Sequence, residues 1–126
     1  MTAPRFDRTP AASGPLVQGF SGLGFSVDGD AYRAVLLTPE RAAAWDPPAL
    51  AELAPAHVEA ALALEPSPEF LILGTGAATA FPPRAFVASL EARGIGVEAM
   101  DSRAAARTWG LLRGEGRWIV AALMPL

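Results

Sequence analysis

The sequence contains no cysteine among its 126 residues. Disulfide bridges, iron–sulfur clusters, thiolate zinc sites and cysteine nucleophiles are therefore excluded. The single histidine, His57, also excludes a metal site made of several histidine side chains. His57 lies in a helix-prone segment and is expected to be an ordinary surface or groove residue. We expect the protein to bind no metal and no cofactor.

Lysine is absent as well, since all ten basic residues are arginine, and the formal net charge is −3. A mildly acidic chain offers no basic field to hold a phosphate backbone, so nucleic-acid binding is not expected. No apolar run approaches the roughly 18 residues that cross a bilayer. The first eight residues lack the apolar core of a secretory signal. We therefore expect a cytoplasmic protein that does not insert into membranes.

The hydrophobic fraction of 52% and the chain length suit one domain with a sizeable core. Residues 1–14 show little periodicity and are predicted to be a flexible tail, followed by a single α/β domain over 15–126. The first half of this domain is β-rich. Asp28-Gly29-Asp30 is a hairpin signal. Strands are expected over 16–20, 25–27 and 31–38.

The segment after these strands is harder to assign. Residues 41–45 fit either a helical turn or a short strand. Residues 49–64 favour helix, interrupted at Pro55, which suits the first position of a second helix.

The second half alternates between strands and helices. Four consecutive large apolar residues, from Phe70 to Leu73, end at a Gly-Thr-Gly turn, which is typical of a strand buried on both faces. Pro82 and Pro83 are expected to open a helix that Gly94 ends, and Asp101 or Ser102 to cap another that reaches about Arg113. Strands are expected over 69–73, 95–100 and 118–124. The fold class is α/β: a three-layer domain with an N-terminal antiparallel β ribbon and an α/β/α half built on a mixed, partly parallel sheet.

The candidate site follows from this topology. Right-handed crossovers make strands 69–73 and 95–100 parallel, so both end at the same edge of the sheet, where ligands of open parallel sheets bind. Arg84 lies in the first turn of one helix, and Arg107 lies about 9 Å along the next. The candidate ligand-binding residues are Gly74, Thr75, Gly76, Arg84, Asp101, Ser102, Arg107 and Thr108.

Two interpretations of this edge stay open. Exposed amides of the Gly-Thr-Gly turn, together with a helix N-terminus and an arginine, would hold a carboxylate or phosphate. Alternatively, the glycines only form a tight turn, and Asp101 with Ser102 only caps a helix. Neither the dinucleotide fingerprint nor the P-loop motif is completed from Gly74 or Gly76.

No catalytic residue is predicted. The spacing of Asp101 from Glu98 and Glu115 does not form a carboxylate dyad, and no hydroxyl lies in a nucleophile elbow. Trp109 and Trp118 are expected to be core anchors rather than binding platforms.

Several segments, taken in order, resemble a known family. They are Leu71-Ile72-Leu73-Gly74-Thr75-Gly76, Pro82-Pro83, Gly94-Ile95, Met100-Asp101-Ser102, Ala105-Ala106-Arg107-Thr108 and Glu115 to Leu123. Together they resemble the small α/β domain family that includes mitochondrial NADH dehydrogenase (complex I) assembly factor 3 and the adipogenesis-associated domain proteins. The resemblance implies a compact three-layer fold, no established catalytic activity, and action through protein partners.

The resemblance also marks individual positions. Gly74, Thr75, Gly76, Asp101, Thr108, Glu115 and Arg117 fall on the family's signature positions. One departure follows Thr108, where this chain has Trp109-Gly110 in place of the family's usual Tyr-Asn. Losing a phenol and a carboxamide removes two polar groups, which weakens an enzymatic interpretation. Gly110 inside a helix predicts a bend or close packing there.

Two hypotheses for function follow. In the first, the protein is a non-enzymatic accessory or binding protein with protein partners, respiratory-chain subunits among them, in the setting of complex I assembly. In the second, it is a small enzyme or sensor that binds an anionic metabolite at the Gly-Thr-Gly turn, with help from Arg84 and Arg107.

Overall fold

The computed structural model of the protein describes residues 14–22 and 24–126. The predicted flexible tail, residues 1–14, therefore lies outside the described residues except for Gly14. In chain order the elements are β1 (Val17–Ser21), β2 (Gly24–Val27), β3 (Asp30–Tyr32), β4 (Val35–Leu37), β5 (Ala42–Ala44), the 3₁₀ turns η2 (Leu50–Glu52) and η3 (Pro55–Val58), α1 (Glu59–Leu62), β6 (Phe70–Gly74), α2 (Arg84–Ala92), β7 (Gly96–Met100), α3 (Ser102–Gly114) and β8 (Val120–Leu123).

The centre of the fold is a five-stranded mixed sheet in the order β5-β4-β8-β6-β7. Strand β6 pairs in parallel with both β7 and β8, while β4 pairs antiparallel with β8 and β5. The predicted α/β class with a mixed, partly parallel sheet is confirmed. Both parallel pairs arise because each helix crosses over the sheet between two strands.

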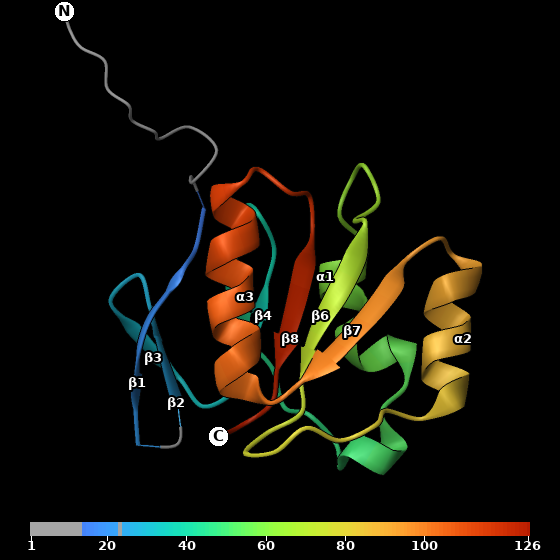
Figure 1. The fold of residues 1–126 in the computed structure, drawn as a ribbon, viewed down its shortest axis with the longest axis horizontal. Helices are drawn as coiled ribbons and strands as arrows, with labels where there is room; N and C mark the ends of the chain where they lie inside the picture. The colour runs from blue at the N-terminus through green and yellow to red at the C-terminus, as the bar shows by residue number, and fades with distance from the viewer. Residues whose placement is uncertain (1–13, 23) are drawn as a thin grey trace, which may run out of the picture.

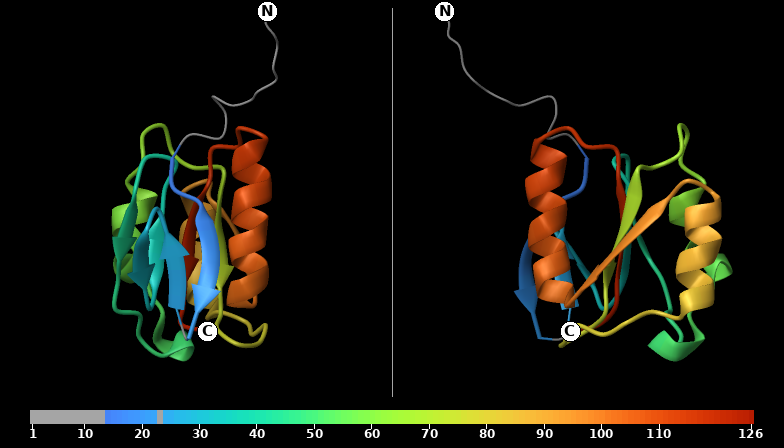
Figure 2. Two further views of the ribbon diagram at one scale, coloured as in Figure 1. Left: turned by 90° about the vertical axis from the view of Figure 1, so that its left-hand side faces the viewer. Right: turned by 45° about the vertical axis from the view of Figure 1, so that its right-hand side comes forward.

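Helices α2 and α3 cover opposite faces of this sheet (Figures 1 and 2). Successive side chains of a strand point to opposite faces, so the apolar run of β6 serves two cores. Leu71 and Leu73 pack on the side of α1 and α2, whereas Ile72 packs on the side of α3, against Trp109. A strand with a core on each side must be apolar throughout, which explains the run Phe70 to Leu73.

The N-terminal ribbon is a separate three-stranded antiparallel sheet in the order β1-β2-β3. Phe25 and Val27 of β2 are buried in the core on the α3 side, so the ribbon adds to that layer (Figure 2). The predicted hairpin turn is present, with positive φ angles of 51° at Asp28 and 87° at Gly29. Two consecutive positive φ angles match the right-handed twist of the flanking strands.

The prediction of a single strand over residues 31–38 is wrong. The chain leaves the sheet at Arg33 and Ala34, so that β3 belongs to the ribbon and β4 to the central sheet. All three residues of β4 are buried, and pairing with β8 places them between the two cores. Burial of β4 therefore decides the break, which the smooth alternation of side chains does not reveal.

The remaining segments form short elements. Residues 41–45, for which two interpretations were open, contain the short strand β5. The helix-prone segment 49–64 forms η2, η3 and the four-residue helix α1, with Pro55 as the first residue of η3. This stretch lies at the carboxyl edge of the central sheet and then along its α2 face (Figure 1).

Candidate functional site

The predicted edge brings the ends of β6 and β7 together. The Thr75 amide donates to the Met100 carbonyl over 2.8 Å, and the Ser102 amide donates to the Gly76 carbonyl over 2.8 Å. The two turns that leave the parallel strands are thus hydrogen-bonded to one another. Thr75 and Asp101 share one rim of the molecule, as the crossover argument predicts.

The Ser102 hydroxyl lies at the centre of this rim and is fully buried. It accepts a hydrogen bond from the Gly76 amide over 2.9 Å and donates one to the Met124 carbonyl over 2.7 Å. The Met124 amide in turn donates to the Gly74 carbonyl over 3.0 Å. The Ser102 hydroxyl therefore joins the chain segments that follow β6, β7 and β8. It both donates and accepts a hydrogen bond within the chain.

Each glycine of the Gly-Thr-Gly turn is required for a different structural reason. A Cβ at Gly74 would lie 2.8 Å from Ser102 Oγ and 3.0 Å from Ser102 Cα, which leaves no space for a side chain. Gly76 has a φ of +107°, where residues with a Cβ are strained. The amides of Thr75 and Gly76 both donate inside the chain, so these two donors are already satisfied without an external anion.

The Thr75 hydroxyl organises the loop that follows. It donates to the Ala78 carbonyl over 2.7 Å, lies 3.2 Å from the Met100 carbonyl, and accepts from the Ala80 amide over 3.1 Å. Loop residues 75–80 are therefore folded around one side chain.

Asp101 and Thr108 are placed by α3. Asp101 is the N-cap of this helix, and its Oδ1 accepts from the Ala104 amide over 2.9 Å, so the predicted helix cap is confirmed. Thr108 Oγ1 lies 3.4 Å from the sulfur of Met100, a weak hydrogen bond that ties α3 to β7. Thr108 lies further along the helix than the rim.

The two predicted arginines lie away from the turn. Arg84 lines a hollow of about 630 Å³ beside α2, together with Phe81. Arg107 lines a smaller hollow, of about 110 Å³, between α3 and β1. Neither hollow contains a residue of the Gly-Thr-Gly turn. The structure therefore joins Gly74, Thr75, Gly76, Asp101 and Ser102 but separates Arg84 and Arg107 from them.

A different arginine, Arg33, shares a hollow with the Gly-Thr-Gly turn. Thr75 and Gly76 line a hollow of about 370 Å³ whose other walls come from residues 47–50, from Met124 and Pro125, and from Arg33. Arg33 is exposed, and within the described residues it has no ion-pair partner. The sequence does not point to Arg33, because the alternation over 31–38 predicts one continuous strand and no local signal marks its break.

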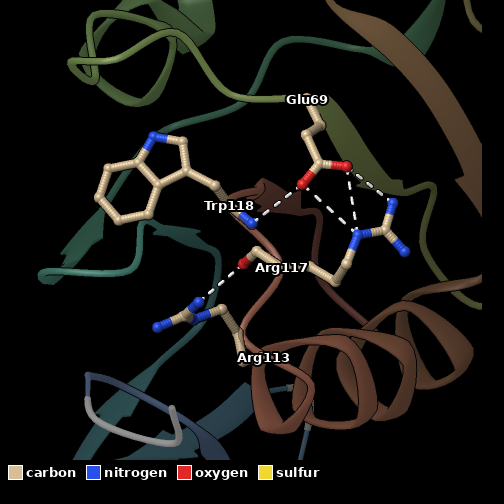
Figure 3. A network of polar contacts seen from close by, with 4 residues as sticks. All are labelled: Glu69, Arg113, Arg117 and Trp118. Carbon is tan, nitrogen blue, oxygen red and sulfur yellow. Dashed lines mark hydrogen bonds and ion pairs between the residues drawn. The ribbon is translucent and has the colours of Figure 1, made fainter. Parts of the chain in front are cut away.

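A second polar group lies at the opposite end of the central sheet (Figure 3). Arg117 donates to Glu69 through Nη2 over 2.8 Å and through Nε over 3.2 Å, and Glu69 also accepts from the Trp118 amide. Arg113 Nη1 donates to the Arg117 carbonyl over 2.7 Å. The ion-pair partner of Arg117 is therefore Glu69.

The ion pair between Glu69 and Arg117 shifts the pKa of both side chains. The hydrogen bond from Arg117, followed by that from the Trp118 amide, lowers the pKa of the Glu69 carboxyl. The same hydrogen bond raises the pKa of the Arg117 guanidinium. Both side chains remain substantially exposed. The pair is therefore a surface salt bridge between the segment that follows α3 and the segment that precedes β6.

Residues 14–22 and 24–126 contain no group of three or more His, Asp or Glu side chains placed to hold a metal ion. The same ranges contain no helix with the length and apolarity needed to cross a membrane.

Comparison with known sequences places the chain in a family. The model of a family of proteins of unknown function, DUF498/DUF598, matches residues 17–124. The chain belongs to the DUF498 family. It is similar to the NADH dehydrogenase [ubiquinone] 1 alpha subcomplex assembly factor 3 of Danio rerio, with 30% identity over 91% of this chain and 67% of that protein. The assembly factor of the same name from Bos taurus is 29% identical, and the chain covers 60% of its length. The resemblance predicted from the sequence is confirmed.

Solved structures of similar proteins share this fold. A crystal structure of a Bordetella parapertussis protein is 34% identical, with a TM-score of 0.82 over 93% of this chain and 100% of that one. A solution structure from Bordetella pertussis, described as a Mth938-like domain, is 30% identical, with a TM-score of 0.78 over 98% of this chain and 92% of that one. The three-layer arrangement is therefore that of experimentally determined relatives.

Trp109 and Gly110 stand where the resemblance in the sequence implies Tyr-Asn. Trp109 is fully buried, and its indole N–H donates to the Pro15 carbonyl over 2.9 Å, so it anchors the start of the ribbon to α3. Of the two alternatives expected at Gly110, a bend or close packing, close packing is wrong, because a Cβ there would meet no atom within 4 Å. Helix α3 continues through this position without a break.

Proposed function

We propose that this DUF498 protein is a non-enzymatic accessory protein that acts in the cytoplasm on subunits of a respiratory complex during assembly. The observation that carries the proposal is its similarity, over 91% of the chain, to a protein named for assembly of the NADH dehydrogenase alpha subcomplex. In this role the chain binds protein partners, respiratory-chain subunits among them.

The geometry of the rim supports a binding role over a catalytic one. The hydroxyls of Ser102 and Thr75 and the amides of Thr75 and Gly76 are all engaged in hydrogen bonds within the chain. Groups that hold the backbone together are poorly placed to change partners during a reaction, and an exchange at Ser102 would leave a buried polar atom unsatisfied.

The test is co-purification of the tagged full chain from its native organism, followed by mass spectrometry. Enrichment of respiratory-chain subunits over the tag alone is the expected result. Absence of such subunits across repeated preparations, with the tagged protein folded and soluble, contradicts the proposal.

The second candidate, an anionic metabolite, is favoured by one observation: Arg33 stands beside Thr75 and Gly76 in the hollow of about 370 Å³. A thermal-shift screen with phosphorylated and carboxylated metabolites tests it, since a ligand that binds the folded state raises the melting temperature. A compound that stabilises the wild type and the Arg84→Ala and Arg107→Ala variants, but not Arg33→Ala, would establish this site. No shift with any metabolite eliminates the candidate for the compounds tested.

A further inference from the structure

One face of α2 carries opposite charges at its two ends and small apolar side chains between them. Arg84, Val87, Ala88 and Glu91 lie three or four positions apart, which places them on one side of the helix. Together with Phe81 and Pro82 they line the hollow of about 630 Å³. This set, from Phe81 to Glu91, is called the α2 face below.

The two charged side chains of the α2 face have no charged partner in the part of the chain that the structure describes. Within the described residues, Arg84 and Glu91 make no ion pair or side-chain hydrogen bond. They also cannot reach one another along the helix, because seven residues span about 10.5 Å. The next arginine shows the contrast: Arg93 donates to Glu59 through two nitrogens, over 2.9 and 3.1 Å.

Phe81 adds a large apolar side chain to this face. It is 94% exposed, although it follows a loop that is held by hydrogen bonds to Thr75. A phenylalanine held in water on an ordered loop is typical of an interaction surface, because burying its ring against a partner is strongly favourable.

We propose that the α2 face binds the α2 face of a second copy of this chain, with the two helices antiparallel about a two-fold axis. The register follows from the numbering. An axis midway between Val87 and Ala88 places Arg84 of one copy opposite Glu91 of the other, and the same pair forms again by symmetry. Small side chains at the centre allow the two helices to approach closely.

The ends of the helix fit the same register. The axis that pairs residue 84 with residue 91 brings Phe81 of one copy to position 94 of the other. That position is Gly94, where no side chain is present and a Cβ would meet no atom within 4 Å. In the dimer, the exposed ring of Phe81 would therefore pack against the end of α2 in the second copy.

Charge complementarity selects a second copy as the occupant. The α2 face is its own electrostatic match only in the antiparallel orientation, since a parallel copy would place Arg84 beside Arg84 and Glu91 beside Glu91. A nine-residue helix is short for a stable interface, so the dimer is expected to be weak and to dissociate on dilution and at high salt.

Charge reversal provides the test, by sedimentation equilibrium of the full chain at low ionic strength. The wild type is expected to show a monomer–dimer equilibrium. The Arg84→Glu and Glu91→Arg variants each create two like-charge contacts, so each is expected to dimerise about tenfold more weakly or worse. An equimolar mixture of the two variants restores both opposite-charge contacts and is expected to form a heterodimer.

Controls separate this outcome from misfolding. Arg107→Glu makes the same charge change at an exposed arginine on α3 and is expected to dimerise like the wild type, while Phe81→Ala weakens the dimer without any charge change. Circular dichroism checks that every variant is folded. The proposal is overturned if the wild type stays monomeric at high concentration. It is equally overturned if the mixture fails to associate, or if the dimer is indifferent to both reversals. The inference does not depend on the proposed function.

Discussion

At the scale of single residues, the buried Ser102 hydroxyl holds the rim together through two hydrogen bonds. It links the start of α3 to the segments after β6 and β8. Its burial means that water cannot replace the bonds it makes, so both partners depend on it.

Removing this hydroxyl should therefore destabilise the fold. Ser102→Ala leaves the Gly76 amide and the Met124 carbonyl without their partner, and we expect a loss of about 1–3 kcal/mol in the free energy of unfolding. Chemical denaturation measures it. Ser89→Ala, at an exposed serine of α2, is the matched control and should change stability little. Equal stabilities for the two variants would contradict the assigned role of Ser102.

Two glycines should respond in opposite directions to alanine. Gly74→Ala forces a Cβ against Ser102 Cα, which is backbone and cannot turn away, so we expect a loss of about 1–3 kcal/mol. Gly110→Ala meets no atom within 4 Å inside α3 and should stabilise by about 0.4–1 kcal/mol, because alanine restricts the unfolded chain. Thermal or denaturant unfolding compares them. A stable Gly74→Ala protein would show that the rim is looser than described.

At the scale of elements, the bond between Glu69 and Arg117 connects two segments that are far apart in sequence. Glu69 precedes β6, and Arg117 and Trp118 precede β8, so the network aligns the starts of neighbouring parallel strands (Figure 3). The Glu59–Arg93 pair plays a similar part between α1 and the end of α2.

The Glu69 network should make stability depend on pH in acid. The folded-state pKa of Glu69 lies below its ordinary value of 4.5, so the unfolded chain takes up the proton first. The stabilisation is fully present above that value and is lost as pH falls through the folded-state pKa. The wild type should therefore exceed Glu69→Gln in stability at neutral pH, with a difference that shrinks below about pH 4.5.

Denaturation midpoints measured across this pH range check the expectation. Glu52→Gln, at an exposed carboxylate in η2, provides the control and should show no such narrowing. A gap between wild type and Glu69→Gln that stays constant down to strong acid would show that the carboxylate is not held in its charged form.

Element by element, prediction from the sequence succeeded where the signal is local. The run Phe70 to Leu73, the Gly-Thr-Gly turn and the Asp101 cap each combine a residue type with a backbone requirement, and all three are present. The continuous strand over 31–38 failed because its break depends on which sheet buries Val35 to Leu37. Alternation along the chain carries no information on that choice.

At the scale of the whole molecule, the separation of the arginines decides what the rim can do. Arg84, Arg107 and Arg33 line three different hollows, on α2, on α3 and beside the Gly-Thr-Gly turn. The arginine that shares a hollow with the Gly-Thr-Gly turn is therefore Arg33, more than forty positions before Thr75 in the chain. For the same reason the self-association proposed for α2 and the metabolite hypothesis at Arg33 concern separate surfaces and can be tested independently.

The sequence by itself determined the α/β class, the central buried strand, the parallel direction of β6 and β7, and hence the rim that their ends share. It could do so because hydrophobic periodicity, glycine turns and the handedness of crossovers act within a few dozen residues. Only the tertiary structure decided which polar groups of that rim are already bonded and which arginine stands near it. Those outcomes depend on how segments far apart along the chain come together: Ser102 and Met124 share a hydrogen bond, and Arg33 and the turn line one hollow. No local pattern encodes the final distance between such segments.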